Sequence, residues 1–183
     1  FSLNNGINKP TVTSELIRRK MNSLYGSLQL NWDGYLFLDV TARNDWSSTM
    51  SKDNRSYFYP SVSLSGVISD MLPKIGGNMP EWFTFAKVRA SYAEVGNDLD
   101  PYQLYNNYTV GKDENGNTTA APGQILFDSS VRSELIKSWE AGFDVRFLQN
   151  RLGLDFAWYK TNATRQLLTL PLDPFAGYSS RKV

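Results

Sequence analysis

The sequence predicts an all-β fold, a segment of an antiparallel transmembrane β-barrel with about six long strands in three hairpins. Three observations lead to this prediction. Apolar and polar residues alternate over about ten positions at a time, whereas a strand of a soluble sheet usually has only five or six residues. Short turns alternate along the chain with long polar connections. Aromatic residues gather at strand ends, where a barrel strand leaves the apolar layer.

The first hairpin, predicted over 22–32 and 35–44, shows the alternation most clearly. Leu28 and Leu30 share one face of the first arm with other apolar residues, and polar residues lie between them. Asp33-Gly34 separates the arms and is a strong signal for a two-residue hairpin turn. An arm of about ten residues spans about 33 Å. With a tilt of about 40° it covers the roughly 25 Å apolar band of an outer-membrane barrel.

Four further strands follow the same pattern, at 57–69, 82–95, 135–147 and 152–161. In the first of them an aliphatic row around Leu64 faces away from a row of serines, so we expect the serine face to contact water. The last two strands flank a short turn at Gln149–Arg151. Together with the first hairpin they complete three hairpins.

The connections are predicted to differ in length on the two sides of the sheet. The irregular segments are residues 1–20 (with a short helix over Ser14–Lys20 as an option), 44–56, 70–81, 96–132 and the tail from Thr161. Tight or moderate turns alternate with loops of about a dozen to nearly forty residues, as periplasmic turns and extracellular loops do in outer-membrane barrels.

Composition excludes several classes of function. The 183 residues include no histidine and no cysteine, which excludes Ser-His-Asp catalysis, thiolate chemistry and the commonest metal ligands. We therefore expect no enzyme activity, no metal and no cofactor. Lys+Arg is 19 and Asp+Glu is 18, so no basic surface is predicted to attract nucleic acid. The sequence opens without a signal peptide, and we interpret it as a piece of a longer protein.

Several stretches, in the same order as in one known family, cover nearly the whole chain. They are Tyr25–Ser27, Arg43–Thr49, Tyr57–Ser65, Lys87–Tyr92 with Gly96-Asn97, Lys137–Asp144 and Asn150–Phe156 with Tyr159-Lys160. In these stretches the chain resembles the barrel of the SusC/RagA-type TonB-dependent transporters of Bacteroidetes outer membranes.

The resemblance implies more than the pattern does. Residues 1–183 would form part of one TonB-dependent receptor β-barrel domain, within a plugged barrel of roughly 22 strands. The whole protein would lie in the bacterial outer membrane and import oligosaccharides or peptides with energy delivered through TonB. A SusD-like surface lipoprotein would close it as a lid. The plug and the TonB box are absent from this sequence.

Two groups of residues are candidates for the site. Charged residues on the water-facing rows are expected to face the lumen; they are Asp39, Arg43, Lys87, Arg89, Glu140, Asp144, Arg146 and Asp155. Aromatic residues in or beside long loops are expected to contact substrate or lid; they are Trp46, Tyr57, Tyr59, Tyr102, Tyr105 and Tyr108. The alternatives are cross-strand charge pairing for the first group, and loop packing or a membrane girdle for the second.

Two other functions fit the pattern. A passive porin or barrel-anchored adhesin would have the same barrel without energy coupling, and a soluble glycan-binding β-sandwich would bury the aliphatic rows. The carboxylate pairs Asp98/Asp100 and Asp113/Glu114 have the residue types of a glycosidase. They lie in Gly/Asn/Pro-rich segments with no neighbour expected to raise a pKa, so we do not assign them a catalytic role.

Overall fold

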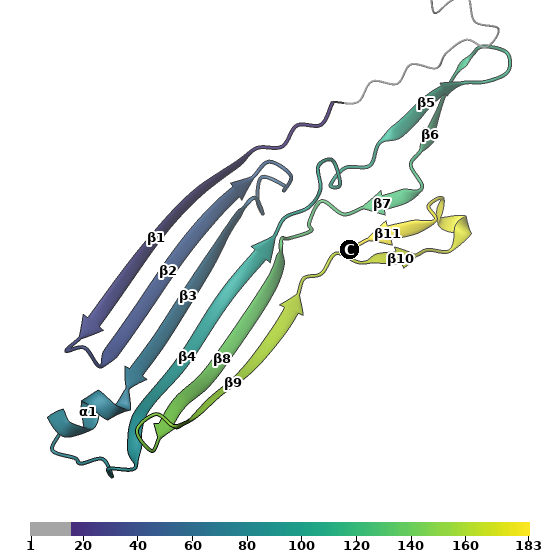
Figure 1. Cartoon of the computed structure of the whole chain (residues 1–183). Helices are drawn as coiled ribbons and strands as arrows, with labels where there is room; N and C mark the ends of the chain where they lie inside the picture. The colour runs from purple at the N-terminus through teal and green to yellow at the C-terminus, as the bar shows by residue number, and fades with distance from the viewer. Residues whose placement is uncertain (1–15) are drawn as a thin grey trace, which may run out of the picture.

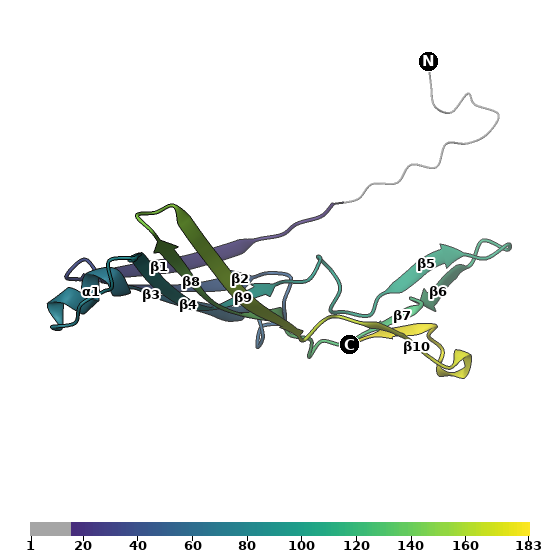
Figure 2. The same cartoon turned by 60° about the horizontal axis from the view of Figure 1, so that its bottom comes forward.

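A computed structural model of the chain describes residues 16–183, in which six long strands form one open antiparallel sheet. The strands lie in the order β1-β2-β3-β4-β8-β9 (Figure 1). Figure 2 shows that the sheet is curved and that β1 and β9 are its open edges. The long strands are β1 (Met21–Trp32), β2 (Leu36–Ser47), β3 (Ser56–Val67), β4 (Phe83–Asn97), β8 (Glu134–Phe147) and β9 (Leu152–Thr164).

The register of the sheet carries the sequence alternation across all six strands. Leu38 lies opposite Leu64, and Leu64 lies opposite Ala90. Because residues directly opposite each other point to the same side, the aliphatic rows merge into one surface, the apolar face. The serines of β3 and the charged rows form the other surface, the polar face. Residues that mark the apolar face are Leu28, Val40, Leu64, Val88, Phe143 and Phe156.

The sheet has no packed layer on the apolar face within residues 16–183. Leu28, Leu64 and Phe156 are 54%, 46% and 51% exposed. A soluble sheet of this width would cover such a surface, because exposed contiguous aliphatic area is unfavourable in water. The single six-stranded sheet therefore differs from the two packed layers of the sandwich alternative and has the form of a barrel wall.

One end of the sheet, the turn end, carries short connections. Asp33 and Gly34 both have positive φ, 51° and 77°, as the predicted two-residue turn requires. The turn between β8 and β9 has positive φ at Leu148, Gln149 and Asn150. Both turns thus lie where the sequence predicted them.

The third connection at the turn end corrects a prediction. The strand predicted to reach Ser69 ends at Val67, and the helix α1 (Ile68–Lys74) takes up the start of the connection predicted at 70–81. Gly76, two residues after the helix, has a φ of +83°, and the Gly77 N–H bonds to the Leu72 carbonyl at 2.8 Å. A favourable helix end thus overrides the strand pattern of the preceding residues.

Lys74 at the end of α1 ties the helix to the first hairpin. Its Nζ lies 2.7 Å from the Asp33 carboxylate and 5.2 Å from the centre of the Tyr35 ring. The helix therefore closes the gap between two turns that are distant in sequence. This contact depends on tertiary structure, which is why the strand pattern alone did not predict it.

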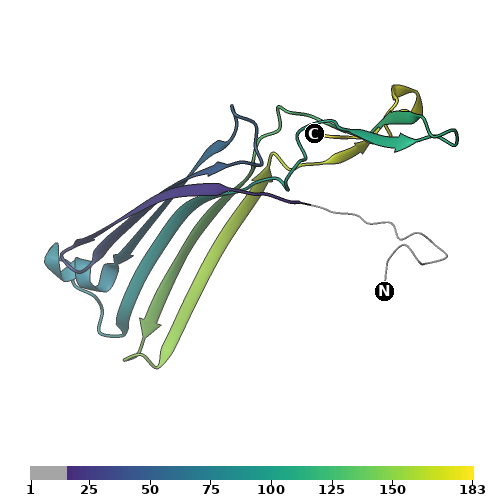
Figure 3. The ribbon, with the colours of Figure 1, turned by 90° about the horizontal axis from the view of Figure 1, so that it is seen from above.

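The other end, the loop end, is more ordered than the sequence predicted. The segment 96–132 and the tail both contain strands, and β2, β4 and β9 extend beyond their predicted ends. Figure 3 shows these elements beyond one end of the sheet, with α1 at the opposite end. The loop-end elements are β5 (Tyr108–Lys112), β6 (Thr118–Pro122), β7 (Ile125–Phe127), β10 (Thr169–Pro171), η2 (Pro174–Ala176) and β11 (Ser180–Lys182).

The pairing of these short strands explains the difference. β7 pairs in parallel with β11, which joins Ile125–Phe127 to residues about fifty positions later in the chain. β5 and β6 form a separate antiparallel hairpin. Three-residue strands have no detectable alternation, so only their long-range partners define them.

The segment before β1 is irregular over residues 16–20, in agreement with the predicted loop. The optional helix over Ser14–Lys20 does not form in these residues, and Ser14 itself lies outside the described residues. Among residues 16–183, no helix is long and apolar enough to cross a membrane.

Candidate functional site

The loop end contains a small buried core. Met50, Leu99 and Leu104 are 6%, 5% and 4% exposed, and Tyr57, Val131 and Leu167 pack against them. Tyr57 comes from the start of β3, and the others come from the connections that follow β2, β4, β7 and β9. We call residues 16–20, 47–57, 98–107, 128–133 and 167 the loop cap. Because this core joins the connections, the loop cap is a folded unit rather than a set of separate loops.

Asp98 is the polar centre of the loop cap. Its side chain is 3% exposed, and one carboxylate oxygen accepts a hydrogen bond from Arg19 at 2.5 Å. The other oxygen accepts from the hydroxyls of Ser47 at 2.5 Å and Thr49 at 3.0 Å. The N–H of Ser48 bonds the Lys20 carbonyl at 2.9 Å. One buried carboxylate thus holds three segments together, and its charge is compensated by a guanidinium and two hydroxyls.

A groove of about 540 Å³ lies on the polar face directly beside Asp98. Arg43 donates from Nε to the buried Asp45 carboxylate at 2.8 Å and from Nη2 to Ser23 at 3.2 Å. The rings of Tyr57 and Tyr59 lie 5.1 Å apart along one wall. The groove therefore presents guanidinium donors and aromatic surface, while its carboxylates lie beneath them.

Tyr59 marks the place where two strands separate. Pairing between β3 and β4 stops at Ser61 and Ala93. Beyond that point the Tyr59 ring packs directly on Gly96, where a side-chain carbon would overlap the ring. The Tyr59 hydroxyl is buried and has no hydrogen-bond partner in the described part of the chain. Gly96 thus allows an aromatic ring to fill the widening gap at the loop end.

The other predicted aromatic residues do not gather at this groove. Tyr102 accepts a hydrogen bond from the Arg18 N–H at 3.2 Å and donates to the Leu16 carbonyl at 3.4 Å, so it fastens the segment before β1. Tyr105 and Tyr108 are 63% and 69% exposed. Trp46 lies opposite Asn22 and Ser56 in the rows of the apolar face, where the girdle alternative places it.

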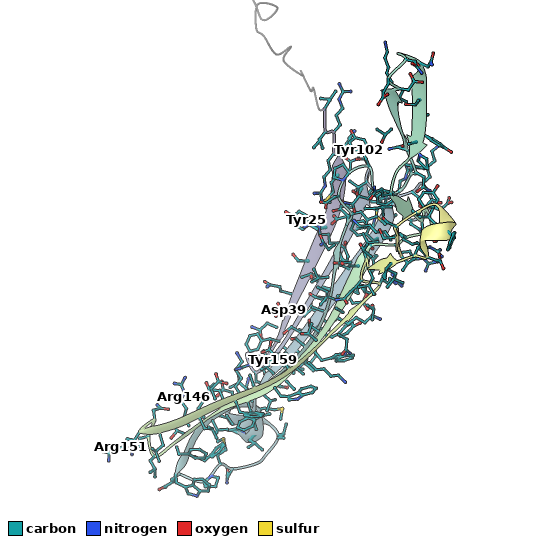
Figure 4. The ribbon with its side chains drawn as sticks, turned by 90° about the vertical axis from the view of Figure 1, so that its right-hand side faces the viewer. Tyr25, Asp39, Tyr102, Arg146, Arg151 and Tyr159 are labelled. Carbon is teal, nitrogen blue, oxygen red and sulfur yellow. The ribbon has the colours of Figure 1, made fainter. Side chains whose placement is uncertain are left out.

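The eight predicted lumen residues all lie on the polar face. Figure 4 shows Asp39 and Arg146 on the same side of the sheet as Tyr25 and Tyr159. Six of the eight form ion pairs, and three of these six, Arg89, Glu140 and Asp155, pair across strands as in the alternative. These pairs are Arg89 with Asp155 at 2.9 Å and with Glu140 at 3.6 Å, Arg146 with Asp144 at 3.5 Å, and Arg43 with Asp45 at 2.8 Å. Asp39 and Lys87 line one groove together with Ser65.

Arg89 crosses a neighbouring strand to reach its partner. It starts on β4 and lies over Gly142 of β8, and its guanidinium bonds to Asp155 on β9. A side-chain carbon at position 142 would lie 3.1 Å from Arg89 Nε and 2.7 Å from the Phe156 carbonyl oxygen. The absence of a side chain at Gly142 therefore lets the guanidinium lie flat on the polar face.

Two carboxyl groups at the loop end have lowered pKa values. Residues 16–183 contain no group of three metal-ligating side chains. In the loops, the Asn117 amide lowers the pKa of the Asp113 carboxyl. Hydrogen bonds from Ser130 and then Arg181 lower the pKa of Asp128 to about 2. Both shifts favour an ionised carboxylate, whereas a general acid needs a raised pKa.

Sequence reasoning missed the residues that organise the loop cap. Asp98 was considered only as half of a carboxylate pair with Asp100, and Arg19 and Asp45 were not singled out. The partners of Asp98 lie 79 and 51 positions away. The sequence did carry one signal. Mostly polar residues stand at the loop-end termini of two long strands, at 45–49 and at 97–98. No local rule joins those two segments.

Comparisons with known proteins agree with this geometry. The family described as TonB dependent receptor-like, beta-barrel matches residues 2–182. Two relatives come from Formosa agariphila. TonB-dependent receptor P3 is 29% identical over 178 residues, 92% of this chain and 17% of its own length. TonB-dependent receptor P26 is 26% identical over 179 residues, 93% of this chain and 17% of its own length.

Solved structures share the fold. A structure of the RagAB peptide importer in the 'closed-closed' state matches with a TM-score of 0.82 at 18% identity, over 100% of this chain and 20% of that chain. A structure in the 'open-open' state matches with a TM-score of 0.79 at 18% identity, again over 100% of this chain and 20% of the other.

An open antiparallel sheet with one apolar and one polar face has the structure of a wall segment of a transmembrane β-barrel. The chain belongs to the TonB-dependent receptor family, within its β-barrel domain. The predicted fold class and the resemblance to SusC/RagA-type transporters are thereby confirmed. The chain spans about a sixth of the length of the two relatives.

Proposed function

We propose that the whole protein is an outer-membrane importer in which this segment forms part of the barrel wall and of the substrate entrance. Import would be energised through TonB, and the cargo would be an oligosaccharide or a peptide. The observation that carries the proposal is the combination of an uncovered apolar face with a polar face whose loop end carries a folded cap and a groove. The segment binds and guides and catalyses no reaction.

The polar face is the proposed path of the substrate. The guanidinium groups of Arg43 and Arg19 are about half exposed at the groove, and Tyr57 and Tyr59 form its wall. Donors beside aromatic rings suit sugar hydroxyls and peptide carbonyls alike. We therefore propose Tyr57, Tyr59 and Arg43 as substrate contacts at the entrance. Trp46 is left out, because it lies in the rows of the apolar face.

The remaining predicted residues are proposed in two roles. Asp39 and Lys87, which line one groove toward the turn end of the polar face, would face the plug or the passing substrate. Arg89, Glu140, Asp144, Arg146 and Asp155 would keep the lumen wall polar through their mutual pairs.

A surface lipoprotein of the SusD kind is the proposed lid. The RagAB peptide importer shares the fold of this chain, and the lid is carried to this chain only as a proposal. Tyr105 is exposed just before the β5–β6 hairpin, and Tyr108 is exposed as the first residue of β5; all residues of both strands are exposed. We propose these two tyrosines as contacts for the lid.

The test is uptake of labelled oligosaccharides and of labelled peptides by cells that carry the full-length protein. The prediction is uptake that stops when TonB is deleted and falls when Tyr57 and Tyr59 are replaced together by alanine. A control variant with Tyr159→Ala removes an exposed tyrosine of the polar face that lies outside the groove and should import normally. Uptake that continues without TonB would support the passive porin and contradict the importer.

A further inference from the structure

A second groove adjoins the groove beside Asp98, which we call the entrance groove, where β3 and β4 separate. The two share Tyr57, Tyr59 and Glu94, and the second extends from there toward the apolar face. It has a volume of about 400 Å³ and is lined at the loop end by strand residues of the apolar face, among them Phe58, Glu94 and Lys137. Arg132 and Arg165, from the connections that flank β8 and β9, complete its rim. We call this the outer groove.

The rows of β8 and β9 change in character toward the outer groove. In one row Phe143 lies opposite Phe156, and in the next row Ala141 lies opposite Trp158. Next comes Trp139 opposite Lys160, and then Lys137. Apolar surface, a tryptophan level and a cationic level thus succeed one another in the order of hydrocarbon, interface and headgroups.

The tryptophan level is well defined. The rings of Tyr92 and Trp139 lie 4.3 Å apart. Trp139 and Trp158 are each 51% exposed on the apolar face. Half-exposed indole rings at one level of a barrel wall mark the depth at which lipid headgroups begin. The outer groove lies on the loop side of that level.

Positive charge exceeds negative charge around the outer groove. Lys137, Arg132 and Arg165 line it, and Lys160 lies one row below. Of the charged residues that line the groove itself, three are cations and two, Asp53 and Glu94, are carboxylates. Glu94 is 18% exposed and bonds to the Tyr92 hydroxyl and, at 3.3 Å, to Lys137. Glu94 therefore holds Lys137 in place, and the exposed cations of the rim are left to meet a ligand.

We propose that the outer groove binds the phosphorylated headgroup of a lipid in the outer leaflet of the membrane. Guanidinium groups match phosphate oxygens, and the acyl chains of such a lipid would lie against the apolar face below. A lipid fits better than a soluble phosphate compound, because the groove is continuous with the surface that contacts hydrocarbon. The proposal depends on which face meets lipid and is independent of what the barrel imports.

The test uses the full-length protein in detergent micelles and counts bound lipid by native mass spectrometry. The probes are lipid A with its phosphate, lipid A from which the phosphate has been removed, and inorganic phosphate alone. The variant carries Arg132→Ser, Lys137→Ser and Arg165→Ser together. A matched control removes three exposed cations elsewhere, through Arg18→Ser, Lys112→Ser and Arg151→Ser.

The parental protein and the control should retain phosphorylated lipid A, and the groove variant should bind it at least about tenfold more weakly. Each cation near an anionic surface strengthens binding about fivefold, and the two nearby carboxylates reduce the total effect. A double variant with Arg132→Ser and Arg165→Ser changes no strand residue and should show an intermediate loss. This second variant keeps the test valid if the replacement of Lys137 disturbs β8.

Three results would overturn the proposal. Equal retention by the groove variant would show that these cations do not bind the lipid. Equal retention of the dephosphorylated lipid would show that the phosphate does not contribute to binding and that the acyl chains account for it. Displacement by inorganic phosphate at the same concentration as the lipid would identify a soluble anion as the ligand. A failure of import would not affect any of these measurements.

Discussion

Apolar side chains are exposed on one face of the six-stranded sheet and buried in the loop cap. On the sheet, Leu64 is 46% exposed, whereas Leu99 and Leu104 in the loop cap are 5% and 4% exposed. Charged groups differ as well, since Asp155 is 59% exposed in its ion pair and Asp98 is 3% exposed in its own. The apolar side chains of the sheet thus need a covering from outside the segment, whereas those of the loop cap are covered by residues of the segment itself.

The difference indicates what stabilises each region. The sheet depends on the ladder of backbone hydrogen bonds and on lipid at the apolar face. The loop cap lies beyond the sheet and has a small core with a buried carboxylate, as a soluble domain has. A substrate entrance built on such a cap has a preformed shape, because the loops that carry it are held by buried contacts.

The largest effect should come from a charge on the apolar face. Leu64→Arg in the full-length protein is expected to lower the free energy of unfolding by about 2–4 kcal/mol, because the guanidinium would enter hydrocarbon. The measurement is a urea titration in lipid vesicles. Ser63→Arg, one residue away on the polar face, is the control and should change stability by less than about 1 kcal/mol. Equal losses would show that the two faces do not differ in environment.

Loss of the buried carboxylate should weaken the loop cap and spare the sheet. Asp98→Asn keeps the shape but removes the charge that Arg19, Ser47 and Thr49 bond, at a cost of about 1.5–3 kcal/mol. Hydrogen exchange should accelerate in residues 16–20, 47–50 and 99–104 and stay unchanged in the middle of β3. Asp100→Asn, at an exposed position, is the control. Uniform acceleration would mean that cap and sheet form one cooperative unit.

A smaller effect is expected from Gly142→Ala within the sheet. The new carbon would press on Arg89 and on the Phe156 carbonyl, and we expect a loss of about 1–2 kcal/mol. Gly153→Ala is the matched control, since its nearest neighbour would be an ordinary contact 3.9 Å away on Arg146. Urea titration of both variants measures the difference. Equal stability of the two would show that Arg89 finds another path to Asp155.

The smallest effect should follow pH at the loop end. Hydrogen bonds from Ser130, and then the ion pair with Arg181, lower the pKa of Asp128 to about 2. These contacts of the ionised carboxylate therefore stabilise the loop end above the unfolded pKa of about 4. This contribution is lost as pH falls from about 4 toward 2. Pepsin should therefore cleave near residue 181 more readily at the lower pH. Asp128→Asn should show the same susceptibility throughout, and a parental protein without this pH dependence would contradict the assignment.

The sheet was predictable because its information is local. Alternation in β1, β2, β8 and β9 is visible within each strand, and Asp33-Gly34 defines the first turn by backbone geometry alone. The loop end was not predictable, because it depends on pairs such as Asp98 with Arg19 that lie far apart in the chain. The helix at Ile68–Lys74 was missed for a related reason, since its last residue is held by Asp33 of another hairpin.

The sequence by itself determined the strands, their two faces, the absence of histidine and cysteine chemistry, and the kind of membrane wall that such strands build. A period of two is a property of each strand, so it needs no knowledge of neighbours. Only the tertiary structure decided where Asp98 lies, which tyrosines reach the entrance groove, and that Arg132 and Arg165 meet Lys137 at the outer groove. These arrangements arise from contacts between distant segments, which the folded sheet brings to one end.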